Sequence, residues 1–172
     1  MENSNINSQA SVSEKHRLDR EFFITDGLDL AKKLLGKILV RNIGGENVRV
    51  KIVETEAYIG PDDKGAHCYN NRKTERTKYF WQEGGHLYVY RIHQSICLNI
   101  VSNTEEKPEA ILIRAGEPVS GLDTIKKLRG EKKSLLKKND IINLTVPSCD
   151  VIKLISLMIR QGIPKGEVSL CH

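Results

Sequence analysis

The stretch VRVKIVETEAYI, Val48–Ile59, is the strongest strand pattern in this chain. In its first half apolar residues alternate with basic ones, which is typical of a half-buried strand. The second half continues the alternation with Glu54, Glu56 and Tyr58 at the positions that should face the core. Because strand side chains alternate between two faces, we expect these three residues to share one face with the apolar residues that precede them.

Two explanations of this polar face stay open from the pattern alone. Burying a carboxylate without a partner costs several kcal/mol, so glutamates at core positions require a reason. One explanation is that the strand has simply run out into solvent. The other is that Glu54 and Glu56 project into a cleft, where one carboxylate can act as a general base.

The segments around this strand predict an α+β domain with a largely antiparallel set of strands. Leucine spacing and a glycine stop predict a first helix over 26–36, and a capping-box pattern at Ser120 and Asp123 predicts another over 120–130. A last helix is predicted over 149–162. The further predicted strands are 37–43, 85–92, 96–102 and 109–118.

The rest of the chain sets the domain organisation. Residues 60–85 are polar and lack periodicity, and long loops of this kind in compact domains are often functional. We expect a single domain over 21–172, preceded by a disordered polar tail over 1–20. The apolar runs are far shorter than the roughly 20 residues of a membrane helix, and the N-terminus lacks the apolar core of a secretory signal. These features predict a cytoplasmic monomer, nucleoid-associated if bacterial.

Charge and cysteine usage restrict the partners. The 4 cysteines stand singly, without the spacing of a zinc site, so we expect reduced thiols and no metal. A formal net charge of +5 is compatible with a polyanionic partner. Basic residues flank the aromatic segment and favour phosphate contact as a group, although each alone is an ordinary surface charge. They are Arg72, Lys73, Arg76, Lys78 and Arg91.

Aromatic residues gather in the sequence around the two glutamates. Tyr88 and Tyr90 lie on one face of a predicted strand, and Tyr58 and His67 precede them. A single tyrosine in a strand is usually a core residue or part of a cross-strand pair. Together with a carboxylate and a basic loop, these residues predict a slot that stacks a flat heterocycle.

The motifs VETEAY, His67, GHLYVYRI, CLNIV and EAILIRAGEP resemble, in that order, the alkyladenine (3-methyladenine) DNA glycosylase family. The resemblance covers residues 22–129. It implies a curved, open-barrel-like sheet and a monofunctional base-excision repair enzyme. Such an enzyme flips alkylated or deaminated purines (3-methyladenine, 7-methylguanine, hypoxanthine) out of damaged double-stranded DNA and hydrolyses the N-glycosidic bond, without a cofactor or a lyase step.

The same resemblance assigns roles to individual residues. Glu56 corresponds to the general base that activates the attacking water, and Glu54 has a supporting place in the motif. Asn99 corresponds to the residue that disfavours the 2-amino group of normal guanine. The residues matched to the substrate pocket are Tyr58, His67, Tyr90, Asn99 and, at its edge, Arg114.

The chain departs from the family in two places. The tip RIHQSICLN is one residue shorter than the family's hairpin, and His93 stands where the intercalating wedge is expected. The chain also ends at His172, where family members carry a longer tail, so we expect an exposed sheet edge or an incompletely covered core. Two other functions therefore stay open: a catalytically weak damage-binding protein of the same fold, and a basic RNA-binding module.

Overall fold

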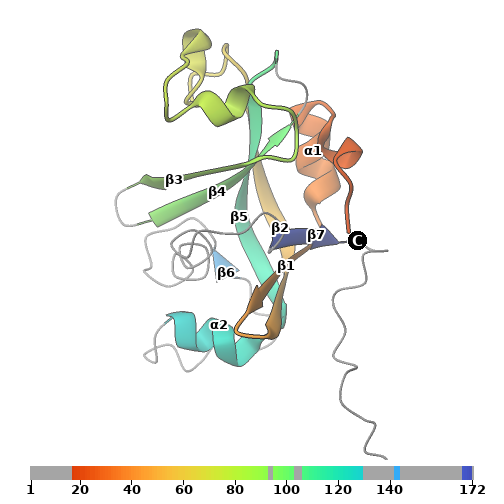
Figure 1. The fold of residues 1–172 in the computed structure, drawn as a ribbon. Helices are drawn as coiled ribbons and strands as arrows, with labels where there is room; N and C mark the ends of the chain where they lie inside the picture. The colour runs from red at the N-terminus through yellow and green to blue at the C-terminus, as the bar shows by residue number, and fades with distance from the viewer. Residues whose placement is uncertain (1–16, 93–94, 103–105, 130–141, 144–167, 172) are drawn as a thin grey trace, which may run out of the picture.

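The protein is a curved antiparallel sheet with helices beside it (Figure 1). The computed structural model describes residues 17–92, 95–102, 106–129, 142–143 and 168–171. Its helices are α1 (Gly27–Leu34) and α2 (Leu122–Arg129), with short 3-10 helices η2 (Glu21–Phe23), η3 (Tyr69–Asn71) and η4 (Lys78–Trp81). Its strands are β1 (Ile38–Ile43), β2 (Glu46–Ile59), β3 (Leu87–Ile92), β4 (Ser95–Ser102), β5 (Glu109–Ser120), β6 (Ile142–Asn143) and β7 (Val168–Cys171).

The sheet order is β3-β4-β5-β2-β1-β7, with β6 paired to β5, and every pairing is antiparallel. The long strands β2 and β5 run through the middle, and β3 and β4 splay away from them so that the sheet curves (Figure 1). The predicted α+β class and curved sheet are confirmed. β7 pairs along the outer edge of β1, so that edge is covered. No helix in the described ranges is long and apolar enough to cross a membrane.

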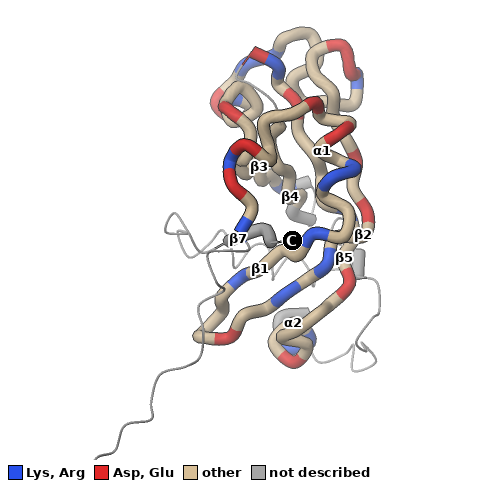
Figure 2. Tube along the Cα trace, turned by 90° about the vertical axis from the view of Figure 1, so that its right-hand side faces the viewer, with Lys and Arg blue, Asp and Glu red and all other residues tan. Residues whose placement is uncertain are grey.

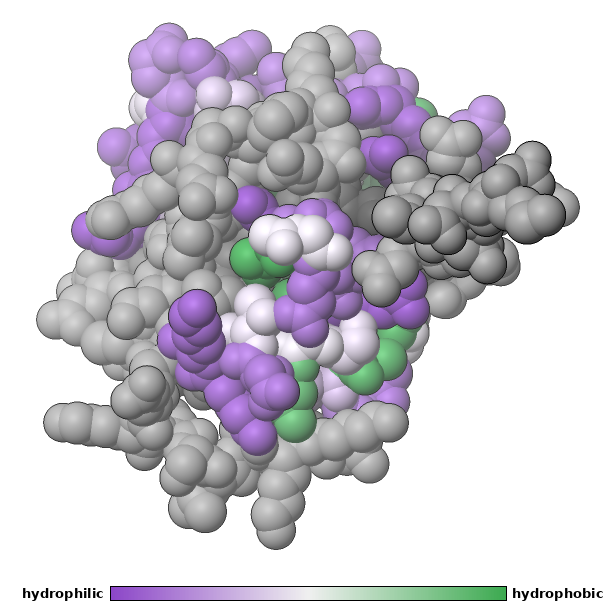
Figure 3. Space-filling model, turned by 60° about the horizontal axis from the view of Figure 1, so that its bottom comes forward, coloured by the Kyte–Doolittle hydropathy of each residue, from purple (hydrophilic) through white to green (hydrophobic). Residues whose placement is uncertain are grey.

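Helix α1 packs its apolar stripe on the sheet. Asp26 caps the helix by accepting a hydrogen bond from the Leu28 backbone N–H at 2.9 Å, and Leu30 and Leu34 are fully buried. The main core forms between this helix and the inner sheet residues of β1, β2, β4 and β5. From below, the described apolar side chains form only small groups between polar ones (Figure 3).

A bulge in β2 reverses the faces of this strand. Ile52 pairs with Gly116 but Glu54 pairs with Ala115, so β2 advances by two residues while β5 advances by one; at the next pair, Thr55 with Ile113, β5 advances by two and the register is restored. A bulge of this kind adds one residue to a strand and shifts the alternation of its side chains. Ile52 lies in the main core, and beyond the bulge Thr55 donates a hydrogen bond to the Ala31 carbonyl of α1 at 3.0 Å.

The glutamates therefore lie on the opposite face from the apolar half of β2. Ala57, like Thr55, faces the main core, whereas Tyr58 packs in a second cluster with residues of β3, β4 and β5. The expectation that Glu54, Glu56 and Tyr58 share a face with the preceding valines and isoleucine was wrong, because the alternation is broken at the bulge. The three residues do share one face with each other, as expected.

The segment boundaries differ from expectation at two places. Leu18 is buried in the core and Arg20 Nη1 donates a hydrogen bond to the Gly84 carbonyl at 2.9 Å, so both belong to the folded domain. The predicted capping box is absent: Ser120 ends β5, and its hydroxyl donates to the Asn47 carbonyl at 3.0 Å. Residues 1–16 and the predicted helix over 149–162 lie outside the described residues.

Gly121 makes the turn from β5 into α2, and we expect its replacement by alanine to destabilise the fold strongly. Its φ is +75°, and an added Cβ would lie 2.8 Å from Val48 Cγ2 and 2.9 Å from Val48 Cα. Gly36→Ala is the control, because Gly36 has a φ of +82° with open space around it. The left-handed backbone costs both variants about 1–2 kcal/mol, and the clash adds about 1–3 kcal/mol at Gly121. Equal urea-unfolding free energies for the two variants would contradict this account.

Candidate active site

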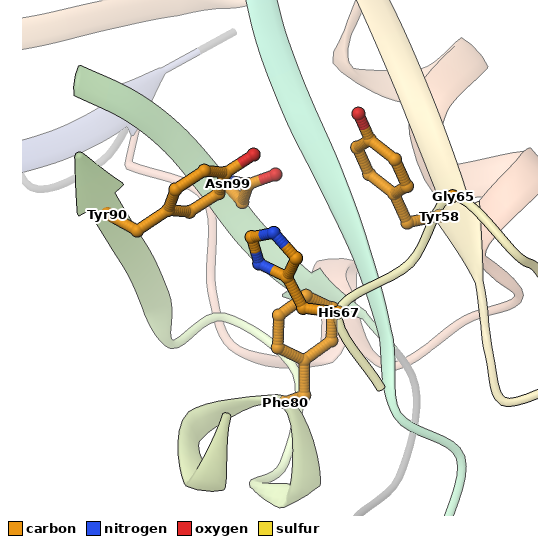
Figure 4. A pocket seen from close by; sticks show the side chains of 6 residues that line it. All are labelled: Tyr58, Gly65, His67, Phe80, Tyr90 and Asn99. Atoms are coloured by element: carbon orange, nitrogen blue, oxygen red, sulfur yellow. The ribbon is translucent and has the colours of Figure 1, made fainter. Parts of the chain in front are cut away.

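Side chains from four segments converge on one slot (Figure 4). Tyr58 comes from β2, His67 from the loop after β2, Tyr90 from β3 and Asn99 from β4. Gly65 and Phe80 complete the lining. The cavity between them is about 10 Å³, which is room for one water molecule at most. The slot is therefore too narrow for a purine in this conformation, and the aromatic side chains have to move apart to admit one.

The aromatic rings of the slot support one another. His67 and Tyr90 have ring centroids 4.6 Å apart with an edge-to-face tilt of 65°. His67 Nδ1 lies 2.9 Å from the Tyr88 hydroxyl, and Phe80 packs edge-on to Tyr88 at 4.4 Å. Tyr88 itself is only 1% exposed. The expectation that Tyr88 lines the slot was wrong: it lies behind the slot and holds His67 in place.

The titratable side chains of the slot are uncharged at neutral pH. Burial, helped by the nearby Glu56 carboxylate, raises the pKa of Tyr58 to about 12, and burial also raises the pKa of Tyr90. Both hydroxyls therefore stay protonated at neutral pH. Burial, with the positive charges of Arg76 and Arg72, lowers the pKa of His67. The imidazole is therefore uncharged at neutral pH, and the slot wall carries no positive charge of its own.

The lowered pKa of His67 predicts a pH dependence of stability. The fold favours the neutral imidazole, so its contribution is fully present above the ordinary pKa of 6.5 and is lost as the pH falls from there through the lowered folded value. We expect the urea-unfolding free energy of the wild type to fall more steeply between pH 7 and 5 than that of His67→Gln. Identical pH profiles for the two proteins would contradict a neutral His67.

Arg114 joins the two glutamates at the edge of the slot. Its Nε donates to Glu54 Oε1 at 3.2 Å and its Nη1 donates to Glu56 Oε2. The hydrogen bond that Arg114 donates to Glu56 is the main reason that the pKa of Arg114 is raised. The Glu54 side chain is 55% exposed and the Glu56 side chain 40%, so Glu54 has reached solvent while Glu56 stands at the site's rim. Neither glutamate lines the slot itself.

Asn99 has a fixed orientation in the slot floor. The residue is 1% exposed, and its Nδ2 donates to the Tyr88 carbonyl across the β3–β4 ladder at 3.2 Å. A carbonyl oxygen can only accept, so the amide nitrogen must face it. The amide oxygen turns toward the slot (Figure 4). The arrangement presents a buried hydrogen-bond acceptor to whatever occupies the slot.

The predicted phosphate-binding residues differ in the contacts that they make. Lys78 pairs with Glu75 at 2.8 Å, and Lys73 lies over the Trp81 ring at 5.3 Å. Arg76 lies over the Tyr90 ring at 5.1 Å, and Arg91 is exposed on β3. Charges of both signs stand on the loop above β3 (Figure 2), so sign alone does not identify the residues that face a site. His93 lies outside the described residues; the pairing of Ile92 with Ser95 leaves two residues at this tip.

The sequence and the site together point to one family. Residues 21–146 match the Methylpurine-DNA glycosylase family. The chain belongs to this family. The resemblance seen in the sequence is confirmed at the level of the family.

Three curated relatives are named "Putative 3-methyladenine DNA glycosylase". The protein of Natranaerobius thermophilus is 48% identical over 128 residues, 74% of this chain and 64% of the relative. That of Clostridioides difficile is 46% identical over 130 residues, with the same two shares, and that of Clostridium botulinum is 50% identical over 131 residues, 73% of this chain and 65% of the relative. The match thus spans slightly less than two thirds of each relative's length.

Two slot residues were missed from the sequence. Phe80 lies within the run YFW of η4 in the loop that lacks periodicity, so no pattern assigned it a direction. Gly65 leaves space beside Tyr58: an added Cβ would lie 3.2 Å from Asp63 Oδ1 and 3.7 Å from the Tyr58 ring. The aromatic run at 79–81 was the only available signal for Phe80.

Proposed function

We propose that this protein is a DNA glycosylase that removes alkylated or deaminated purines from duplex DNA by hydrolysing the N-glycosidic bond. The observation that carries the proposal is the convergence of Tyr58, His67, Tyr90 and Asn99 on one slot beside Glu56, in a member of this family. The substrate class follows from the chemistry of that slot. A damaged purine costs less to flip than a normal paired base, and the flipped base needs an aromatic slot to occupy.

The slot suits a purine whose ring carries positive charge. Alkylation at N3 or N7 makes the base cationic and a good leaving group, so the enzyme needs little acid catalysis. Neutral tyrosine faces attract a cationic ring by about 0.5–2 kcal/mol. The neutral form of His67 adds no repulsion to this attraction. Tyr58 and Tyr90 are therefore the proposed stacking residues, with His67 as a third wall.

Glu56 is the proposed general base. Its carboxylate stands on the same strand face as Tyr58, at the rim where the sugar of a flipped nucleotide would lie. It accepts a proton from water, and the hydroxide equivalent attacks C1′ of the deoxyribose while the purine departs. Arg114 holds the carboxylate through Nη1 and is itself held by Glu54 through Nε. Glu54 is thus a supporting residue, one step removed from the water.

Contacts with the DNA backbone are proposed for Arg72, Arg76 and Arg91. Arg72 and Arg91 are exposed and have no ion-pair partner among the described residues. Lys73 and Lys78 are engaged with Trp81 and Glu75 in their own loop, which weakens the proposal that they contact the DNA backbone. His93 stays a prediction, as the intercalating residue at the β3–β4 tip.

A second candidate, a damage-binding protein with weak or no turnover, is favoured by the narrow slot and the two-residue tip. The test is a set of duplexes that carry 3-methyladenine, 7-methylguanine or hypoxanthine, followed by alkali cleavage of abasic sites. We expect strand breaks at one or more lesions. Salt-sensitive binding of the duplexes without breaks would establish the damage-binding function instead. Stronger competition by structured RNA than by damaged duplex would favour an RNA-binding function.

A further inference from the structure

Phe80 lines the slot, but the function proposed above assigns it no role. It is one of the six residues that form the lining. Tyr58, His67 and Tyr90 are the proposed stacking residues, and Asn99 presents a hydrogen-bond acceptor. A phenylalanine side chain has no donor, acceptor or titratable group. What Phe80 offers to a bound base is therefore the position and the volume of its ring.

The Phe80 ring is held by the protein core. Its side chain is 2% exposed and belongs to the second core cluster, whose buried members are Ala66, Cys68, Phe80, Tyr88, Val101 and Ala110. The ring packs edge-on against Tyr88, with centroids 4.4 Å apart and an interplanar angle of 64°. Its backbone N–H donates to the carbonyl of the buried Thr77 at 2.9 Å. Both the ring and the backbone of Phe80 are therefore fixed, and this wall has little room to retreat.

The stacking residues of the slot are held less firmly than its two ends. Tyr58, His67 and Tyr90 are half-buried, whereas Phe80 and Asn99 are buried, at 2% and 1% exposed. A cavity of about 10 Å³ has to widen before it admits a purine. The half-buried rings border solvent, so they are the side chains that move apart. The two buried residues then stay in place as the fixed ends of the widened slot.

The two fixed ends meet different parts of a bound purine. In Figure 4 the Asn99 amide and the Phe80 ring lie on opposite sides of the His67 ring. Asn99 is the residue proposed to meet the 2-amino edge of the base. N7 lies at the far end of a purine from C2, because C2 and C5 are opposite corners of the larger ring and C5 carries N7. A base whose 2-position meets Asn99 therefore turns N7 and its substituent toward Phe80.

We propose that Phe80 sets the size of the largest substituent that the slot accepts at N7 of a purine. A methyl group is admitted when the half-buried rings move apart. A longer chain at N7 meets a ring that Tyr88 supports from behind, and overpacking a fixed wall is unfavourable. The slot thus selects bases methylated at N7 over bases that carry an ethyl or larger group there. This inference rests on the proposed function, which supplies the flipped base and its orientation.

Two duplexes that differ only in the N7 substituent of one guanine test this proposal. 7-Methylguanine and 7-ethylguanine are placed in the same sequence, so the 2-amino group and the positive charge are identical. The measured quantity is the ratio of single-turnover base release, ethyl over methyl. We expect Phe80→Leu to raise this ratio by about 5- to 150-fold, the equivalent of the roughly 1–3 kcal/mol that overpacking costs. An unchanged ratio in a folded Phe80→Leu variant would overturn the proposal.

Phe23→Leu is the matched control. It makes the same change at a phenylalanine that is 8% exposed in the main core and does not line the slot. We expect it to keep the wild-type ratio, because a loss of stability lowers the release of both bases alike. Equal shifts of the ratio in Phe23→Leu and Phe80→Leu would show that Phe80 acts only through stability, which overturns the proposal.

Phe80→Met is a second slot variant, which tests the size limit if Phe80→Leu does not fold. Methionine fills irregular core space, and its unbranched side chain can bend away from an ethyl group. We expect this variant to raise the ethyl-to-methyl ratio in the same direction. A folded Phe80→Met variant with the wild-type ratio would count against the size limit as firmly as the leucine variant.

The size limit and the glycosylase reaction fail separately. Affinity for the two duplexes, relative to undamaged duplex, is also measured with Glu56→Gln in every protein, so that base release does not interfere. If the wild type releases neither base but Phe80→Leu raises the ethyl-to-methyl affinity ratio, the glycosylase proposal falls and the size limit stands. If the wild type releases 7-methylguanine while Phe80→Leu changes neither ratio, the size limit alone falls. No release and no shift in affinity refute both.

Discussion

Replacing Glu56 with glutamine is expected to lower single-turnover base release from an alkylated duplex by about 100- to 10,000-fold, the usual contribution of a general base. The amide has nearly the same shape as the carboxylate and can still accept a hydrogen bond from Arg114. It cannot take a proton from water. Affinity for the duplex should change by less than about threefold, because Glu56 stands at the rim and does not line the slot.

Glu54→Gln is the matched control. Glu54 lies two residues away on the same strand face and binds the same arginine, but it is more exposed and farther from the slot. We expect it to lose less than about tenfold in base release, as for an exposed ion pair worth at most about 1 kcal/mol. Equal losses in the two variants would show that the charge balance around Arg114, and not proton transfer by Glu56, is what matters.

Replacing Asn99 with serine is expected to raise the release of normal guanine by about 5- to 150-fold, since the buried Asn99 side chain occupies the space that the 2-amino group needs, and overpacking a buried site costs roughly 1–3 kcal/mol. The wild-type amide is buried and held by the Tyr88 carbonyl, so it cannot turn away from the 2-amino group of guanine. A serine side chain is shorter and leaves space there. The measurement is guanine release from undamaged duplex, with hypoxanthine release from the same variant as reference.

The Asn99 prediction needs a folding control, because the variant also loses the hydrogen bond to Tyr88. Its near-ultraviolet circular dichroism should match the wild type, since Tyr88 and Tyr90 stay packed together. Hypoxanthine lacks the 2-amino group, so its release should change little. A folded variant that still rejects guanine would remove Asn99 from its proposed role.

Apolar periodicity predicts the strands β1 to β5. It does not predict the face of β2 on which the glutamates lie. The apolar positions in the sequence change from even to odd numbers at the adjacent Ile52 and Val53, and the structure breaks the alternation at the same place. This one apolar pair is the only mark that the bulge leaves in the pattern. As a consequence of the bulge, the small residues Thr55 and Ala57 pack toward α1. Small residues are equally common on exposed faces, so their type does not predict this direction.

The site residues that belong to the family motif were predictable from the sequence. The contacts of the basic residues were not, because they depend on the fold. The motif predicted Tyr58, His67, Tyr90 and Asn99, and the structure brings these four together. Basic residues in the loop looked equivalent in sequence. Only the fold shows that some are engaged by an acid or a ring while Lys64, which no pattern singled out, faces a cavity.

The most direct test of the central claim is base release by the unmodified chain, with protein in excess over a duplex that carries one 3-methyladenine. The account predicts free 3-methyladenine in solution and an alkali-sensitive break at the lesion, both lost in Glu56→Gln while the duplex stays bound. A duplex that is fully bound by the wild type, yet yields neither free base nor strand break, would contradict the claim that the VETEAY face forms a hydrolytic active site.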